Sequence, residues 1–265
     1  MTDKPLNYQL LADKLYQTTL EAGRKIMTVY AKDFDVSYKD DKSPVTEADE
    51  AAEKIILRDL LEITPHIPII AEEQASAGNM PDVTNIFWLV DPLDGTKEFI
   101  KKGHDFTVNI ALIKNREPVF GIVYAPALGR MFVAKDPENA VQMDIREGRF
   151  IGEESSISVR DVPECGITAV ASKSHRDADT DAFLEKLGIT DIVGAGSSLK
   201  FCLLAAGEAD IYPRFGPTME WDTAAGHAVL KAAGGTVTNP DGSPFRYQKQ
   251  GFRNGFFIAN AKVDF

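Results

Sequence analysis

In the first half of the chain, one segment reads Trp88-Leu-Val-Asp91-Pro-Leu-Asp94-Gly95-Thr96. The apolar residues before Asp91 predict a buried strand, and Asp94-Gly95 predicts a turn with a helix beginning at Gly95. Asp94 alone could simply cap that helix. However, two carboxylates at a strand end can also bind hard divalent cations, and the backbone N–H groups of Gly95 and Thr96 can bind a phosphate.

Three further acidic segments have a similar relation to predicted elements. Glu72 and Glu73 directly follow a predicted strand over 67–71, so Glu72 lies beside Asp91 if the two strands are neighbours. Thr46 predicts a helix N-cap with Asp49 three residues on, and Asp222 also predicts an N-cap. These caps need no active site, yet a capping carboxylate stays ionised and available to a metal.

The remaining pattern divides the chain into an α+β part over 1–145 and an α/β part over 146–265. The first part has helices at 6–30 and after Thr46, and strands at 67–71, 86–90, 106–113, 119–124 and 131–134, the last three as an antiparallel meander. The polar segment 135–166 fits a boundary. The second part alternates strands at 167–171, 192–194, 209–213, 236–238 and 256–259 with helices at 179–187, 199–206 and 223–233, which favours layered α/β structure.

Composition excludes several classes of protein. The 265 residues carry a net charge of −11, from 29 basic and 40 acidic residues, which disfavours binding to a nucleic-acid polymer. Two cysteines, Cys165 and Cys202, are too few for a disulfide framework and favour a reducing compartment. No signal peptide and no apolar run of about 20 residues is present. We therefore expect a cytoplasmic protein without a transmembrane segment. Peripheral contact at the inner face of the membrane stays open, as does the oligomeric state.

Taken in order, these motifs resemble the lithium-sensitive, magnesium-dependent inositol monophosphatase superfamily over almost the whole chain. The motifs are Glu72-Glu73, Asp91–Thr96 and Trp221–Ala225. Within it, the chain is most similar to the CysQ branch, the 3′(2′),5′-bisphosphate nucleotidases. The segments that carry this likeness are Ser43–Thr46, Thr96–Ile100, Phe106–Leu112, Ser172–His175, Gly196–Cys202 and Tyr212–Pro217. The resemblance implies the sugar-phosphatase fold, a layered αβαβα sandwich with the site between its two parts.

The resemblance also implies a phosphatase site with two or three Mg²⁺ ions. The implied metal ligands are Glu72, Asp91, Asp94, Asp222 and the backbone carbonyl of Leu93. The implied catalytic residues are Thr96 and Asp49, which orient and deprotonate a water, and Thr46, which supports Asp49. The implied phosphate- and substrate-binding residues are Glu72, Leu93, Asp94, Gly95, Thr96, His175, Ser197, Lys200, Arg214 and Asp222.

The implied substrate is a small bisphosphate nucleotide, 3′-phosphoadenosine 5′-phosphate, with its sulfate analogue as a second candidate. Lys200 and Arg214 would bind the 5′-phosphate, with Ser197 donating to phosphate oxygens and His175 at the nucleoside end; Lys173 is a weaker candidate. Two alternatives stay open. One is an inositol or sugar (bis)phosphatase with the same metal site, and the other is a non-enzymatic, acidic cation-binding scaffold.

Overall fold

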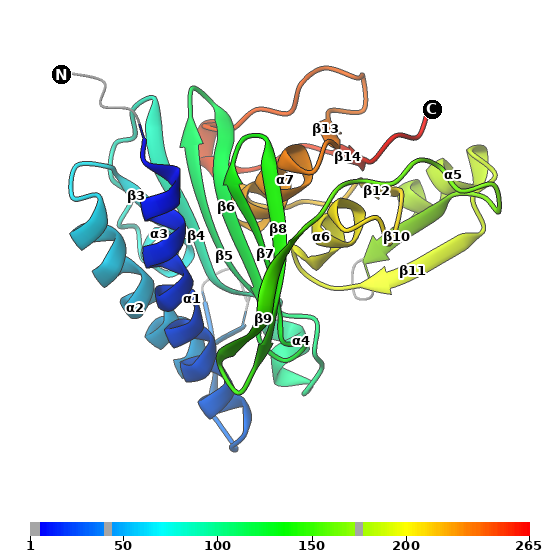
Figure 1. The fold of residues 1–265 in the computed structure, drawn as a ribbon. Helices are drawn as coiled ribbons and strands as arrows, with labels where there is room; N and C mark the ends of the chain where they lie inside the picture. Colours follow the sequence, from blue (N-terminus) through cyan, green and yellow to red (C-terminus); the bar gives the residue numbers. More distant parts are fainter. Residues whose placement is uncertain (1–5, 40–43, 173–176) are drawn as a thin grey trace.

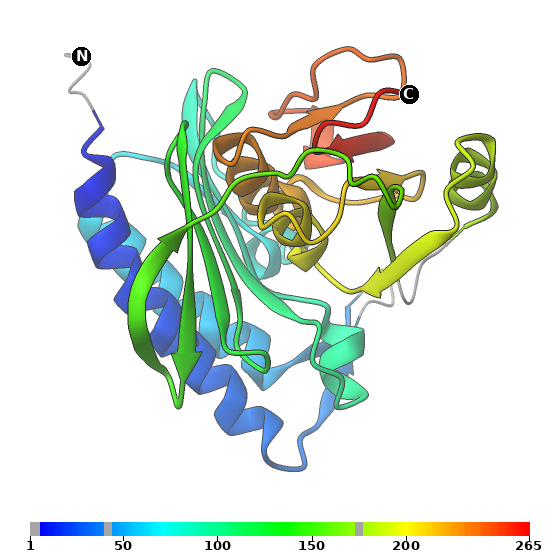
Figure 2. The same ribbon diagram turned by 45° about the vertical axis from the view of Figure 1, so that its right-hand side comes forward.

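The computed structural model describes residues 6–39, 44–172 and 177–265, and these form five layers. Helices α1 (Tyr8–Tyr30) and α2 (Glu47–Ile63) cover one face of a seven-stranded sheet. Helices α6 (Leu199–Ala205) and α7 (Glu220–Ala232) lie between this sheet and a five-stranded sheet. Helix α5 (Ala178–Lys186) covers the far face of the second sheet (Figures 1 and 2). The expected αβαβα sandwich is confirmed.

The first sheet is the antiparallel meander with one parallel strand at its edge. Its order is β3 (Ile69–Ala71), β4 (Ile86–Asp94), β5 (Thr107–Lys114), β6 (Glu117–Ala125), β7 (Arg130–Asp136), β8 (Asn139–Arg146) and β9 (Arg149–Ser156). Strands β3 and β4 are parallel, and every later pair is antiparallel. The meander predicted over 106–134 is therefore confirmed, and the sheet also includes two strands that we did not predict.

Those two strands lie where the sequence indicated a boundary. The division expected at residue 145 falls within the hairpin β8–β9, and the first sheet continues to Ser156. Strand β9 is almost wholly exposed, so its polar sequence is that of a solvated edge strand and resembles a linker. The separation into two domains stays a prediction, with the end of the first sheet now placed at Ser156.

The second sheet mixes parallel and antiparallel strands. Its order is β11 (Asp191–Ala195), β10 (Thr168–Ser172), β12 (Ile211–Arg214), β14 (Phe257–Asn260) and β13 (Thr236–Thr238). Helix α7 packs so closely on the first sheet that a Cβ at Gly121 would lie 2.7 Å from the carbonyl oxygen of Ala225. This close contact brings the N-terminus of α7 to the end of β4.

Short elements complete the end of the fold where the predicted motifs lie. They are β1 (Val36–Tyr38), β2 (Pro44–Thr46), α3 (Glu72–Ser76), α4 (Thr96–Ile100) and a 3₁₀ turn at Gln250–Phe252. Strands β1 and β2 form a small antiparallel pair that leads directly into α2. Among the helices of the described residues, none is both long enough and apolar enough to cross a membrane.

Candidate active site

Two carboxylates come together because β3 and β4 are parallel and paired. Ala71 pairs with Val90, so Glu72 and Asp91 follow at the same edge of the sheet. The Glu72 side chain forms a hydrogen-bonding contact with the Asp91 carboxyl, which is 1% exposed. The expectation that these two acids lie side by side is therefore confirmed.

An irregularity at the end of β4, between Asp91 and Asp94, brings these two acids together. The Oδ1 atom of Asp91 accepts a hydrogen bond of 3.0 Å from the backbone N–H of Leu93. Gly95 has a φ of +94° and precedes the first residue of α4, as the Asp-Gly pair predicted. A Cβ at Gly95 would lie 2.3 Å from Oγ of Ser197, so this position requires glycine.

The fourth carboxylate, Asp222, comes from the other part of the chain. It is the third residue of α7, and its Oδ2 accepts from the backbone N–H of Met219 at 2.8 Å. The prediction that Asp222 is itself the N-cap was wrong by three residues, because its side chain reaches back to cap the helix from inside. Its backbone carbonyl accepts from Oγ of Ser198 at 2.6 Å, and the N–H of Ser198 donates to Oδ2 of Asp94 at 2.8 Å.

Burial and mutual repulsion raise the pKa of these carboxyl groups. Burial, then the charges of Glu72, Asp94 and Asp222, raise the pKa of Asp91 well above its usual value. Burial raises the pKa of Asp94 to about 6, although the charge of Lys200 opposes this. The pKa of Asp222 is likewise well raised, by burial and then by the charge of Asp94. Several buried carboxyl groups held close together despite their mutual repulsion are typical of a site for a hard divalent cation.

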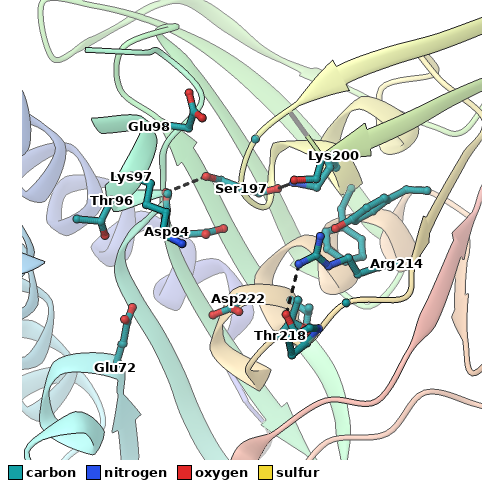
Figure 3. A pocket seen from close by; sticks show the side chains of 18 of the residues that line it. Glu72, Asp94, Thr96, Lys97, Glu98, Ser197, Lys200, Arg214, Thr218 and Asp222 are labelled. Atoms are coloured by element: carbon teal, nitrogen blue, oxygen red, sulfur yellow. Dashed lines mark hydrogen bonds between the residues drawn. The ribbon is translucent and has the colours of Figure 1, made fainter. Parts of the chain in front are cut away.

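The donor set fits magnesium, although the side chains do not yet enclose an ion. Among the described residues, no three acidic, histidine or cysteine side chains already form a closed ligand group. Lys39 occupies part of the ligand set, since its Nζ lies 2.7 Å from carboxylate oxygens of both Glu72 and Glu73. Figure 3 shows Glu72, Asp94 and Asp222 facing one cavity from three separate elements.

A second cluster adjoins the cavity and contains the predicted catalytic residues. The capping box of α2 is present as predicted, since Asp49 Oδ2 accepts from the N–H and the Oγ of Thr46 at 2.9 and 2.8 Å. The other oxygen of Asp49 lies 3.1 Å from Oγ of Thr96, which also lies 3.1 Å from the Leu93 carbonyl. Burial raises the pKa of Asp49 to about 6. Thr96 thus links a carboxylate to the cavity, while the catalytic roles stay predictions.

The cavity has a volume of about 640 Å³ and a cationic wall opposite Glu72. Lys200 and Arg214 line it, and both are buried. The Nζ of Lys200 donates to the carbonyl of Ser197 at 2.7 Å, and burial lowers the pKa of Lys200 to about 8. An Arg214 nitrogen lies 3.4 Å from the Pro217 carbonyl.

The structure does not test the expected substrate-binding roles of Ser197 and His175. The Oγ of Ser197 lies 2.8 Å from the backbone carbonyls of both Asp94 and Asp105, so its hydroxyl proton is committed to the turn. Phosphate binding by Ser197 therefore stays a prediction with a competing structural role. His175 and Lys173 lie outside the described residues.

Two residues that the sequence did not single out hold the carboxylate cluster together. Ser198, buried and inside the segment 196–202, links Asp94 to Asp222. The amide of Asn109 donates to Oγ of Ser198 at 3.0 Å and approaches Asp94 at 3.4 Å. An asparagine within the apolar strand 106–113 was an available signal, whereas nothing in the local pattern distinguished Ser198.

Comparison with known proteins agrees with this geometry. The profile of the inositol monophosphatase family matches residues 7–260. The chain belongs to this family. A protein of Escherichia coli O157:H7, named 3′(2′),5′-bisphosphate nucleotidase CysQ, is 45% identical over 257 residues, covering 94% of this chain and 99% of that protein.

Solved structures of the family have the same fold. The crystal structure of CysQ from Bacteroides thetaiotaomicron matches with a TM-score of 0.81 and 36% identity, covering 98% of this chain and 100% of that one. An inositol monophosphatase (IMPase) from Thermotoga maritima matches with a TM-score of 0.75 and 26% identity, over 95% of this chain and 92% of that one. The family is thus shown by both sequence and structure.

Proposed function

We propose that this protein is a Mg²⁺-dependent 3′(2′),5′-bisphosphate nucleotidase. It removes the 3′-phosphate from 3′-phosphoadenosine 5′-phosphate to give AMP and phosphate, and accepts 3′-phosphoadenylyl sulfate as a second substrate. The observation that carries the proposal is one cavity with a carboxylate cluster at one end and the cations Lys200 and Arg214 at the other. The names of the CysQ relatives support it.

The carboxylate end is suited to phosphate-ester hydrolysis. Glu72, Asp91, Asp94, Asp222 and the Leu93 carbonyl would hold two or three Mg²⁺ ions, which supply a water of lowered pKa and neutralise charge on the phosphate. The chain itself then has three tasks there: to orient the attacking water, to accept its proton and to hold the phosphate.

Asp49 and Thr96 can perform the first two tasks. With a pKa of about 6, Asp49 is ionised at neutral pH, and its Oδ1 lies 3.1 Å from the hydroxyl of Thr96. A proton from a water bound to Thr96 can therefore move to this carboxylate. The backbone N–H groups of Gly95 and Thr96 are at the turn where a phosphate would be held.

The cationic wall favours a nucleotide bisphosphate over inositol 1-phosphate. A second phosphate separated from the reacting one needs a positive partner, and the Lys200 ammonium is preformed and buried at the cavity. An inositol monophosphate has no second anion for this group. Inositol or sugar phosphatase activity is the alternative enzyme function, and cation binding without hydrolysis is the non-enzymatic one.

The test measures phosphate release at fixed Mg²⁺, with and without Li⁺. The substrates are 3′-phosphoadenosine 5′-phosphate, adenosine 3′-monophosphate, inositol 1-phosphate and fructose 1,6-bisphosphate. We expect Lys200→Met to raise the KM for the bisphosphate by about 10- to 100-fold, as for loss of a charged hydrogen bond. The KM for adenosine 3′-monophosphate should change by less than about threefold, because it lacks the 5′-phosphate.

Lys54→Met is the matched control, since Lys54 is an exposed residue of α2. Faster turnover of inositol 1-phosphate would eliminate the nucleotide assignment and leave the metal site standing. No phosphate release from any of the four esters would favour the scaffold.

A further inference from the structure

Helix α2 carries a second buried carboxylate one turn beyond Asp49. Glu53 lies four residues after Asp49, on the same face of the helix. It is 5% exposed, and its Oε2 accepts a hydrogen bond of 2.9 Å from the backbone N–H of Glu73. The backbone N–H of Gln74 also hydrogen-bonds to this carboxylate. Glu53 takes no part in the proposed mechanism.

The two bonds of Glu53 serve the first turn of α3. The first N–H groups of any helix have no acceptor within the helix itself. The N-cap of α3 is Ala71, whose side chain forms no capping hydrogen bond. Glu53 supplies the missing acceptor from a neighbouring helix, and thereby ties the backbone directly after Glu72 to α2.

Lys39 also contacts Glu72 and Glu73, but only through their side chains. Lys39 pairs with the carboxylates of Glu72 and Glu73, so its ion pairs can move together with those side chains. Glu53 instead binds the main chain, and therefore fixes the direction in which Glu72 leaves the strand. Asp49 and Glu53 together let one face of α2 align both Thr96 and Glu72.

We propose that Glu53 is a positioning residue that directs the Glu72 carboxylate toward the cation site by anchoring the first turn of α3. The inference rests on the proposed function, since it requires Glu72 to be a metal ligand. It assigns to Glu53 an effect on magnesium affinity rather than on nucleotide binding.

The experiment measures the gain in melting temperature as Mg²⁺ is added to substrate-free protein. The variants are Glu53→Ala, Glu53→Gln and the control Glu50→Ala, in which an exposed acid of the same helix is removed. We expect Glu53→Ala to raise the apparent Mg²⁺ Kd fitted to this gain by about tenfold, the lower range for residues that orient metal ligands. Glu53→Gln keeps a carbonyl acceptor, so its increase should be about threefold, and Glu50→Ala should match wild type.

Steady-state kinetics provide the second readout. The Mg²⁺ concentration for half-maximal phosphate release should rise in the same order, while the nucleotide KM at saturating Mg²⁺ stays within about twofold. An unchanged apparent Mg²⁺ Kd in Glu53→Ala would overturn the inference, even if its melting temperature without metal falls. If Glu53→Ala does not fold, an unchanged apparent Kd in Glu53→Gln has the same force. A wild-type protein that gains no stability from Mg²⁺ would refute the proposed metal site itself, which is a separate result.

Discussion

Replacing Asp94 with asparagine should stabilise the metal-free protein at neutral pH. Asp94 lies among Asp91, Asp222 and Glu72, and burial raises its pKa to about 6 from a usual value of 3.8. An acid whose pKa is raised in the folded state contributes its full share of stability only below its unfolded pKa, and that contribution is lost as the pH rises through the folded pKa. The amide of the Asp94→Asn variant carries no charge at any of these pH values and escapes this loss.

The size of the effect follows from the shift. A change of about two pKa units corresponds to about 3 kcal/mol at pH 7.5. The pKa of about 6 already includes the attraction to Lys200, and asparagine keeps an oxygen for the N–H of Ser198. A gain of about 3 kcal/mol corresponds to roughly 6–12 °C in a chain of this length. At pH 4.5 the penalty falls to about 1 kcal/mol, and the variant should lose most of its advantage.

The assay is thermal unfolding followed by circular dichroism, with chelator present, at pH 7.5 and pH 4.5. A parallel series is measured with millimolar Mg²⁺. The added Mg²⁺ should stabilise the wild type and should stabilise Asp94→Asn much less, because the variant lacks one anionic ligand. Glu50→Gln, which removes an exposed charge from α2, is the control. A variant that is less stable than wild type at pH 7.5 without metal would refute the reasoning that these carboxylates repel.

Two further changes separate catalysis from folding. Thr96→Val keeps the shape of the side chain but removes the hydroxyl beside Asp49. We therefore expect kcat to fall by about 100-fold with little change in KM. Steady-state phosphate release at saturating Mg²⁺ measures both constants. Retention of wild-type kcat would exclude Thr96 from the proton path. Asp210→Asn weakens the paired 2.8 Å bonds from Arg160 at the opposite end of β12 from Arg214. We expect a loss of about 2 kcal/mol in the free energy of unfolding by urea and an unchanged kcat, and an altered kcat would show that this ion pair acts on the site.

Short-range patterns were sufficient for much of the architecture. The alternation of strands and helices, the meander, the Thr46 cap and the turn at Gly95 are all present as predicted. Each depends on residues within a few positions of one another, through periodicity, capping or backbone preference. The same reliance on local pattern explains the errors. The exposed strand β9 has the composition of a linker, and a capping carboxylate looks alike at the N-cap and three residues later.

The sequence by itself indicated which residues we expect to carry the chemistry, since carboxylates at strand ends and helix starts are visible in the linear pattern. Only the tertiary structure decided how they act together. It brings Asp222 beside Asp94 through Ser198, commits the hydroxyl of Ser197 to backbone carbonyls, and pairs Lys39 with Glu72. Contacts between residues so far apart along the chain depend on how the layers pack. That packing also sets burial, and burial with the neighbouring charges raises the pKa values of the carboxyl cluster.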